Sequence, residues 1–146
     1  MFRLMIADDE DAERMGIRFL LCKFGYFFDI REASDGMEAL AGLGEFAADI
    51  LVTDVKMPFL SGIQLAAKVR EQFPDMQIIF FSGYDDFEYV KQALSLQAVD
   101  YILKPVDPSE FKRVIDRVVE RLTQEKETST QNEAFLKNYV IARLLN

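Results

Sequence analysis

The chain of 146 residues has no histidine and a single cysteine, Cys22. Without histidine, it cannot build a Ser-His-Asp triad, a Cys-His nucleophile, a His-ligated zinc site or a phosphohistidine of its own. One cysteine excludes an internal disulfide and favours a reducing compartment, so we expect a cytoplasmic protein. No apolar run approaches the roughly 20 residues that span a bilayer, so we expect no membrane partner.

Basic residues are also in the minority, since 17 Lys and Arg stand against 25 Asp and Glu, for a formal charge of −8. This balance disfavours a basic face for nucleic acid, and we expect no direct nucleic acid contact by these residues. Half of the residues are apolar and 29% are charged, which are the proportions of a globular domain. The available chemistry is therefore that of carboxylates, lysine, hydroxyls or a hard metal ion.

Short apolar runs alternate with segments of helical spacing along the chain. The predicted strands are Arg3–Ala7, Phe27–Ala33, Ile50–Thr53, Gln77–Phe81 and Tyr101–Leu103. The predicted helices are Ala12–Cys22, Met37–Leu43, Ile63–Phe73, Phe87–Leu94 and Phe111–Leu122. This alternation predicts a doubly wound α/β fold with a five-stranded parallel sheet and five helices. The run Phe27–Ala33 alternates most clearly and is predicted to lie at an edge of the sheet.

Three of the predicted helices have apolar residues at helical spacing, which we expect to face the core. These stripes are Ala12, Met15, Phe19 and Cys22; then Phe87, Val90 and Leu94; then Phe111, Val114, Ile115, Val118, Val119 and Leu122. The fifth helix, Phe111–Leu122, also has a start signal, because Asp107 supplies an N-cap and Pro108 suits the first helical position.

The C-terminal part of the chain changes in composition after the fifth helix. Gln124–Asn132 is polar and is typical of a linker or a frayed helix, whereas Ala134–Asn146 is apolar again. The apolar segment is too short for a domain. It fits a docking helix, part of a signalling coiled coil, or the first helix of a further module, and we expect a helical C-terminal tail.

Polar residues stand where four of the predicted strands end. Asp8 and Asp9 follow the first strand, Asp54 the third, Ser82 the fourth and Lys104 the fifth. Because the carboxyl ends of parallel strands meet at one edge of a sheet, we expect these side chains to converge. Three carboxylates there repel one another by about 1 to 4 kcal/mol per pair at 4 Å, so a cation must compensate them. Without histidine the ligands are all oxygen, which suits Mg²⁺.

A metal ion, a lysine and a hydroxyl around one central carboxylate are the equipment for phosphoryl transfer. Asp54 stands alone at the end of the central strand, whereas Asp8 and Asp9 form a pair suited to holding a metal ion. The residues therefore predict an aspartyl phosphate at Asp54. Each acid taken singly also fits a helix cap or a solvated loop, but their combination on successive strand ends argues against that interpretation.

Five sequence stretches support a family resemblance: LMIADDE, EASDGMEAL, DILVTDVKMPFLSG, IIFFSGYDD and VDYILKPVD. In this order they resemble the receiver domain of two-component response regulators, the CheY-like domain, over about residues 2–123. The resemblance implies a flavodoxin-like sheet of strand order 2-1-3-4-5. It also implies a regulatory domain rather than an enzyme, which accepts a phosphoryl group from a sensor histidine kinase and slowly hydrolyses it. We expect residues 1–123 to form the receiver domain and 124–146 to form a linker and a partial connector helix.

The resemblance assigns the metal site residue by residue. Asp54 is implied to be the phosphoacceptor and a Mg²⁺ ligand. Asp9 is implied to bind Mg²⁺ directly and Asp8 mainly through water, with the backbone carbonyl of Lys56 as a further ligand.

The resemblance also assigns the residues that act on the phosphoryl group and sense it. Lys104 and the Ser82 hydroxyl are implied to contact the phosphoryl oxygens, and the bond between Lys104 and Pro105 is expected to be cis. Tyr101 matches the aromatic switch of the family, although a half-buried tyrosine at a strand end is an equally good interpretation. Lys56 and Tyr84 occupy the variable positions that flank the phosphate and tune its lifetime.

The stretch SGYDDFEYVKQAL with VDYILKPVD most resembles receivers attached to AraC-type helix-turn-helix output domains. This resemblance implies a transcriptional output, with DNA binding in a domain outside these residues, and receiver–receiver dimerisation through the fourth helix, fifth strand and fifth helix. The chain is expected to be either part of a longer regulator or a stand-alone receiver with a helical tail. A phosphorylation-independent pseudo-receiver remains an alternative. A Mg²⁺-dependent aspartyl-phosphate phosphohydrolase is less favoured, because Lys56 stands where such enzymes need a second acid.

Overall fold

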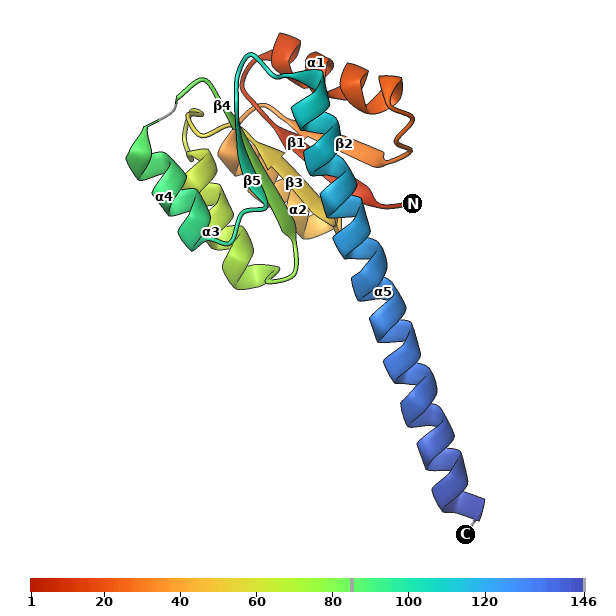
Figure 1. Ribbon diagram of the computed structural model, residues 1–146. Coiled ribbons are helices and arrows are strands. Elements are labelled where there is room, and N and C mark those ends of the chain that lie inside the picture. Colours follow the sequence, from red (N-terminus) through yellow and green to blue (C-terminus); the bar gives the residue numbers. More distant parts are fainter. Residues whose placement is uncertain (85, 146) are drawn as a thin grey trace. The chain divides into compact units, whose positions relative to one another are not determined.

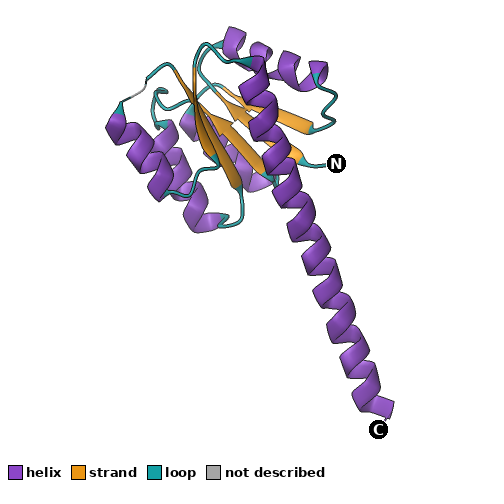
Figure 2. Ribbon diagram, in the orientation of Figure 1, coloured by secondary structure: helices purple, strands orange, loops and turns teal. Residues whose placement is uncertain are grey.

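The computed structural model describes residues 1–84 and 86–145, without the side chains of 129, 130, 132 and 137–145. The strands are β1 (Arg3–Ala7), β2 (Asp29–Ala33), β3 (Ile50–Thr53), β4 (Gln77–Ser82) and β5 (Asp100–Leu103). The helices are α1 (Asp11–Lys23), α2 (Gly36–Glu45), α3 (Gly62–Gln72), α4 (Phe87–Ser95) and α5 (Pro108–Leu145). Strands and helices alternate along the chain as the sequence predicts (Figures 1 and 2).

The five strands form one parallel sheet in the order β2-β1-β3-β4-β5. This order confirms the flavodoxin-like topology, including the edge position of β2. The register places Ala7 beside both Ala33 and Thr53, so the ends of the three strands are level. The residues that follow these strands are therefore delivered to one edge of the sheet.

The chain divides into two compact units, residues 1–114 and 115–146, and α5 runs through both. In the first unit, α2, α3 and α4 cover one face of the sheet and α1 lies on the opposite face (Figure 1). Nearly all residues of β1, β3 and β4 are buried, because a parallel sheet between two helical layers needs apolar side chains on both faces.

The second unit consists of the remainder of α5. Residues 124–132, for which the sequence left a linker or a frayed helix open, are helical in the structure. The boundary at residue 123 and the connector role of residues 124–146 stay predictions. Among the described residues, the structure has no helix of the length and apolar character that crossing a bilayer requires.

The predicted inner face of α1 was wrong. Met15 and Phe19 are 67% and 65% exposed and Cys22 is exposed, whereas Ile17 and Leu21 are buried. The helix has apolar residues on two opposite sides, and helical spacing alone cannot say which of them meets the sheet.

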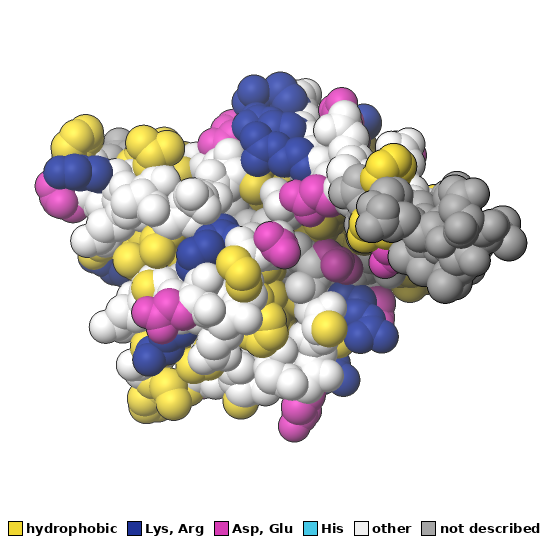
Figure 3. Space-filling model, turned by 90° about the horizontal axis from the view of Figure 1, so that it is seen from below, with side chains coloured by type: hydrophobic (Ala, Val, Ile, Leu, Met, Phe, Trp, Pro, Cys, Tyr) yellow, Lys and Arg dark blue, Asp and Glu magenta, His cyan; other side chains and the backbone are white. Residues whose placement is uncertain are grey.

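The predicted inner face of α4 was wrong as well. Phe87 and Leu94 are 74% and 76% exposed and Val90 is 39% exposed, whereas Ala93 is buried. A small residue lies against the sheet here, and the large apolar residues remain on the surface. Figure 3 shows one face of the molecule, on which hydrophobic side chains are exposed among interspersed acidic and basic ones.

The predicted stripe of α5 was right for most of its members. Phe111 and Val114 in the first unit are fully buried, and the Phe111 ring lies 5.8 Å from that of Phe81 in β4. Further along the helix Ile115, Val118 and Leu122 are also buried.

Candidate phosphoacceptor site

The sheet edge brings together Asp8, Asp54 and Lys104, which are far apart in the sequence. The Lys104 ammonium lies 2.8 Å from Asp8 Oδ2 and 3.5 Å from Asp54 Oδ2. The three side chains are 15%, 1% and 12% exposed in the order Lys104, Asp8, Asp54. One cation therefore stands between two carboxylates in a place that water reaches only partly.

Backbone hydrogen bonds just beyond the strands fix these residues. The Asp8 N–H donates to the Ala33 carbonyl at 3.1 Å, and the Asp54 N–H donates to the Ala7 carbonyl at 2.9 Å. The Lys104 N–H donates to the Ser82 carbonyl at 2.9 Å. The backbone hydrogen bonding of the sheet thus continues one residue past these strands, and it fixes the backbone of the site residues relative to one another.

Three carboxylates form a group that can hold a metal ion. Asp8, Asp9 and Asp54 each offer one oxygen, and these oxygens lie within 4.8 Å of one another. Asp8 is buried, Asp54 is half-buried and Asp9 is exposed. Hard oxygen donors with one face open to water fit Mg²⁺, which keeps several of its water ligands. The donor set therefore suits the ion that the sequence predicts.

An open pocket of about 470 Å³ lies over these acids. Its lining residues are Asp9, Glu10, Glu13, Asp54, Lys56, Gly83, Tyr84 and Lys104. Asp8 and Ser82 are not among them, and both residues are buried. The phosphoacceptor predicted from the sequence is thus accessible to a ligand of phosphate size.

Glu13 is a pocket residue that the sequence analysis missed. Its carboxylate lies 3.8 Å from the Lys104 ammonium. It is in the first turn of α1, where acidic residues usually serve the helix dipole, so its type and place gave no reason to single it out. The expected position of α1 directly after β1 was the signal that could have placed it over the site.

Ionisation of the Asp54 carboxyl group is unfavourable in this partly buried site. Burial raises the pKa of its carboxyl group, and the neighbouring charge of Asp8 raises it further. The Lys104 ammonium and the Val55 N–H, which donates to Asp54 Oδ1 at 2.7 Å, oppose this rise but do not cancel it. Asp54 therefore gains from any additional cation.

Lys104 is held in its charged form. Burial by itself would lower the pKa of the ammonium group. The hydrogen bond to Asp8 and the charges of Asp54, Asp8 and Glu13 outweigh burial and raise that pKa above its ordinary value. Lys104 is thus a permanent cation beside the proposed phosphoacceptor.

Gly62 permits the close approach of α3 to the site. A Cβ atom at this position would lie 1.7 Å from the Asp54 carbonyl oxygen. The Gly62 N–H donates to the Val55 carbonyl at 2.7 Å, and the Thr53 hydroxyl donates to the Asp54 carbonyl at 2.9 Å. The loop after β3 is therefore packed against the backbone of the phosphoacceptor.

Ser82 and Tyr101 both hold the loop between β4 and α4. The buried Ser82 hydroxyl accepts from the Tyr84 N–H at 3.1 Å, and the Tyr101 hydroxyl donates to the Tyr84 carbonyl. Burial raises the pKa of the Tyr101 hydroxyl, so this group stays a hydrogen-bond donor at neutral pH. The structure therefore brings both predicted switch residues to the backbone of one loop residue.

Lys56 lies at the rim of the pocket. Its ammonium is 3.9 Å from the centroid of the Tyr84 ring and 5.7 Å from that of Tyr89. The role predicted for the Lys56 carbonyl as a metal ligand stays a prediction. The bond between Lys104 and Pro105 is cis, as expected.

Comparison with known proteins identifies a family for this chain. The model of the response regulator receiver domain matches residues 4–116. The transcriptional regulatory protein HptR of Staphylococcus aureus is 34% identical over 127 residues, which are 86% of this chain and 50% of that protein. The chain thus spans about half the length of the curated relatives it matches.

Solved structures of similar proteins share the fold. The receiver (REC) domain of AraT, a response regulator of Geobacillus stearothermophilus, superposes with a TM-score of 0.77 at 38% identity, covering 86% of this chain and 98% of that one. A two-component transcriptional regulator AraC of Clostridium phytofermentans superposes with a TM-score of 0.76 at 32% identity, covering 88% and 99%. An acidic group beside a lysine at the carboxyl edge of a 2-1-3-4-5 sheet and a family match over residues 4–116 lead to one conclusion: the chain belongs to the receiver domains of two-component response regulators.

Proposed function

We propose that Asp54 accepts a phosphoryl group from a sensor histidine kinase and that the phosphorylated form switches a downstream output. The observation that carries the proposal is the position of the Asp54 carboxylate, which lines an open pocket beside Lys104 and within the group of three acids. The chain has no histidine, so the phosphodonor histidine belongs to another protein or domain.

In the proposed transfer an Asp54 carboxylate oxygen forms a bond to phosphorus while the bond from phosphorus to the donor imidazole nitrogen breaks. The electron pair of the broken bond stays on that nitrogen. The Val55 N–H holds Asp54 Oδ1 and so orients the carboxylate, and the Lys104 ammonium offers hydrogen-bond donors to the phosphoryl oxygens. Asp9, Asp54, Asp8 and the Lys56 carbonyl would hold Mg²⁺, which would supply further neutralisation of the phosphoryl charge.

Phosphorylation adds about −1.5 to −2 charge at this point, and the switch follows from where that charge lies. The Ser82 hydroxyl leaves the Tyr84 N–H to donate to a phosphoryl oxygen. The loop after β4 then shifts, and Tyr101 loses its partner at the Tyr84 carbonyl and changes its exposure. The domain is regulatory and slowly removes its own phosphoryl group, so it turns over no free substrate.

We place the output in transcription. The support is the similarity to HptR, which is named a transcriptional regulatory protein, and to the AraC protein of Clostridium phytofermentans, which is named a two-component transcriptional regulator. DNA binding then lies in a helix-turn-helix domain outside these residues, with residues 124–146 as linker and connector. The single cysteine favours the reducing cytoplasm as the compartment.

A second receiver is the proposed partner of the α4–β5–α5 surface. Phe87 and Leu94 of α4 and Leu103 of β5 are exposed apolar residues there. Their exposure gives apolar surface that a second copy of the chain can cover.

Incubation with acetyl phosphate and Mg²⁺ tests the proposal. We expect the mass of the protein to increase by one phosphoryl group, and EDTA and Asp54→Asn to abolish the increase. Asp75→Asn is the matched control, because Asp75 is an exposed acid in the loop before β4 and lies outside the pocket. Labelling that persists in Asp54→Asn contradicts the assignment of the phosphoacceptor.

The same experiment separates the alternatives. A pseudo-receiver takes no label under any condition. A phosphohydrolase releases phosphate steadily from many phosphate esters without keeping a label. Either result overturns the proposed function.

A further inference from the structure

Arg14 is a charged residue at the start of α1 whose side chain is only 13% exposed. Its Nη1 donates to the backbone carbonyl of Asp8 at 2.6 Å, and its Nε donates to Glu32 Oε1 at 3.1 Å. Its Nη2 donates to Asp11 Oδ1. The guanidinium therefore joins the loop after β1, the first turn of α1 and the strand β2.

The contact between Arg14 and Asp8 lies within the proposed metal site. The carbonyl that accepts from Arg14 belongs to the peptide group between Asp8 and Asp9, the two acids proposed to hold the metal ion. The Asp8 carboxylate is fixed separately, by Lys104 at 2.8 Å and by the Glu10 N–H at 3.0 Å. Arg14 thus holds the backbone from which the exposed Asp9 side chain extends.

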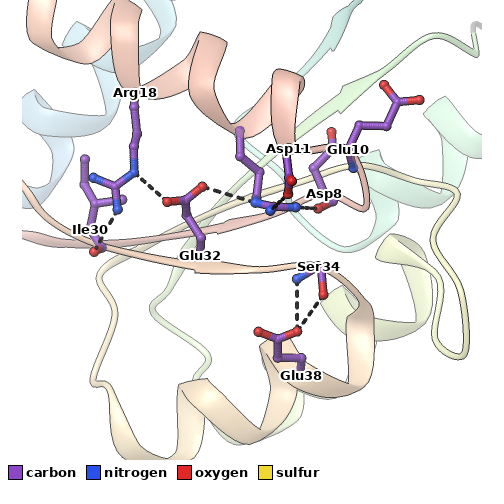
Figure 4. Close-up of polar contacts among 9 residues, drawn as sticks. Asp8, Glu10, Asp11, Arg18, Ile30, Glu32, Ser34 and Glu38 are labelled. Atoms are coloured by element: carbon purple, nitrogen blue, oxygen red, sulfur yellow. Dashed lines mark hydrogen bonds and ion pairs between the residues drawn. The ribbon is translucent and has the colours of Figure 1, made fainter.

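Glu32 anchors Arg14 to the edge strand. Its second oxygen accepts from Arg18 Nε at 2.7 Å, and Arg18 Nη2 reaches the Ile30 carbonyl at 3.4 Å. Figure 4 shows this network around Asp8, Asp11 and Glu32, with Arg18 and Ile30 beside it. The two arginines share the Glu32 carboxylate. Among the hydrogen bonds of the described residues, Arg14 bonds to Asp8 in the loop after β1, whereas Arg18 does not.

We propose that Arg14 is a positioning residue for the Mg²⁺ site, which sets the peptide between Asp8 and Asp9 by clamping it to Glu32 of β2. The inference rests on the proposed function and adds a residue that is neither a metal ligand nor a pocket-lining group. A rigid planar guanidinium with several donors suits this task, because it can hold a carbonyl and a carboxylate in a fixed relation.

A positioning role and a purely electrostatic role of Arg14 predict opposite changes in Mg²⁺ affinity when Arg14 is replaced. A positive charge near a cation site repels the cation, so its removal alone strengthens Mg²⁺ binding. Loss of a positioning contact instead lets the peptide between Asp8 and Asp9 rotate. Mg²⁺ binding must then fix the orientation of the two acids, and this ordering lowers the affinity for Mg²⁺. Groups behind metal ligands typically contribute 10- to 100-fold to metal affinity.

Mg²⁺ titration by calorimetry of Arg14→Met and Arg18→Met measures this difference. Both variants lose one positive charge and one partner of Glu32, but only Arg14→Met loses the contact with Asp8. We expect Arg14→Met to bind Mg²⁺ about tenfold more weakly than the wild type, and Arg18→Met to bind it as the wild type does. At saturating Mg²⁺, Arg14→Met should take the full label from acetyl phosphate, because its phosphoacceptor is intact.

Equal affinity in the two variants, or tighter binding by Arg14→Met, overturns the positioning role while leaving the proposed function in place. Failure of the wild-type protein to bind Mg²⁺ is a separate result, which overturns the metal site and the inference together. Thermal unfolding in EDTA establishes whether Arg14→Met is folded. If it is not, Arg14→Lys serves instead, since it keeps the charge but not the planar fork, and weaker Mg²⁺ binding by this variant supports positioning whereas wild-type affinity contradicts it.

Discussion

The ammonium group of Lys56 lies 3.9 Å from the centroid of the Tyr84 ring, so two of the residues that line the pocket are in contact with each other. Lys56 belongs to the loop after β3 and Tyr84 to the loop after β4. The cation–π contact therefore joins the loop of the phosphoacceptor to the loop that Ser82 and Tyr101 hold.

Loss of this contact should be measurable as a coupling between the two side chains. We expect Tyr84→Leu and Lys56→Gln each to lower the free energy of unfolding, and the double variant to lose less than their sum by about 0.5 to 1 kcal/mol, the usual strength of an exposed cation–π contact. Chemical denaturation of the four proteins measures the coupling. Tyr84→Phe is the control that keeps the ring and should stay coupled to Lys56; strict additivity of Tyr84→Leu and Lys56→Gln contradicts the prediction.

Asp54→Asn is expected to stabilise the unphosphorylated domain at neutral pH without Mg²⁺. The folded-state pKa of Asp54 is raised above its ordinary value of 3.8, mainly by burial, so the native state binds the proton more tightly than the unfolded state does. The ionised carboxylate therefore costs stability at neutral pH, and this cost disappears as the pH falls through the raised folded-state pKa towards 3.8.

Thermal unfolding in EDTA as a function of pH measures this difference. The midpoint of Asp54→Asn should lie above that of the wild type at pH 7, and the gap should close in acid. A variant that is less stable than the wild type at pH 7 would mean that the attraction of Lys104 outweighs the cost of burial.

The sequence predicted the sheet and the acids of the site for one physical reason. In a parallel sheet covered on both faces, the apolar run stops where the strand leaves the core, so a polar residue directly after the run is at the carboxyl edge. Asp54 after Ile50–Thr53 and Lys104 after Tyr101–Leu103 are both of this kind. Their meeting across 50 residues of sequence followed from topology alone.

Helix faces and charged neighbours could not be predicted in the same way. The helix α1 has apolar residues on two sides, and only packing selects Ile17 and Leu21 over Met15 and Phe19. An arginine at the position of Arg14 is usual on the surface of a helix, yet its hydrogen-bond partners come from the loop after β1 and from β2. Such contacts depend on the orientation of α1 over the sheet, which no local pattern records.

Phe59 is in a conformation that few bulky residues adopt. Its φ is 69°, its side chain is 85% exposed, and the Leu60 N–H donates to the Pro58 carbonyl across it at 2.8 Å. The hydrogen bond between the residues on either side of Phe59 marks a γ-turn with positive φ, a strained conformation that favours glycine. We expect Phe59→Gly to be about 1 kcal/mol more stable than Phe59→Ala.

The alanine variant is the proper reference for this prediction, because both substitutions remove the ring and differ in their tolerance of positive φ. Urea denaturation compares the two free energies of unfolding. Equal stability of the two variants would show that the loop relaxes to negative φ when the ring is absent.

Two glycines give a matched pair for the packing beneath the phosphoacceptor. A Cβ at Gly62 would lie 1.7 Å from the backbone carbonyl oxygen of Asp54, whereas a Cβ at Gly16 on the exposed side of α1 meets nothing within 4 Å. Gly62→Ala must therefore move the loop after β3 or the start of α3, and we expect a loss of more than about 2 kcal/mol in the free energy of unfolding. Gly16→Ala should instead gain roughly 0.5 to 1 kcal/mol, because alanine is the better residue inside a helix. Since the displaced backbone is that of Asp54, Gly62→Ala should also slow labelling by acetyl phosphate, while Gly16→Ala labels at the wild-type rate; wild-type stability and labelling in both variants would contradict the close approach of α3 to the site.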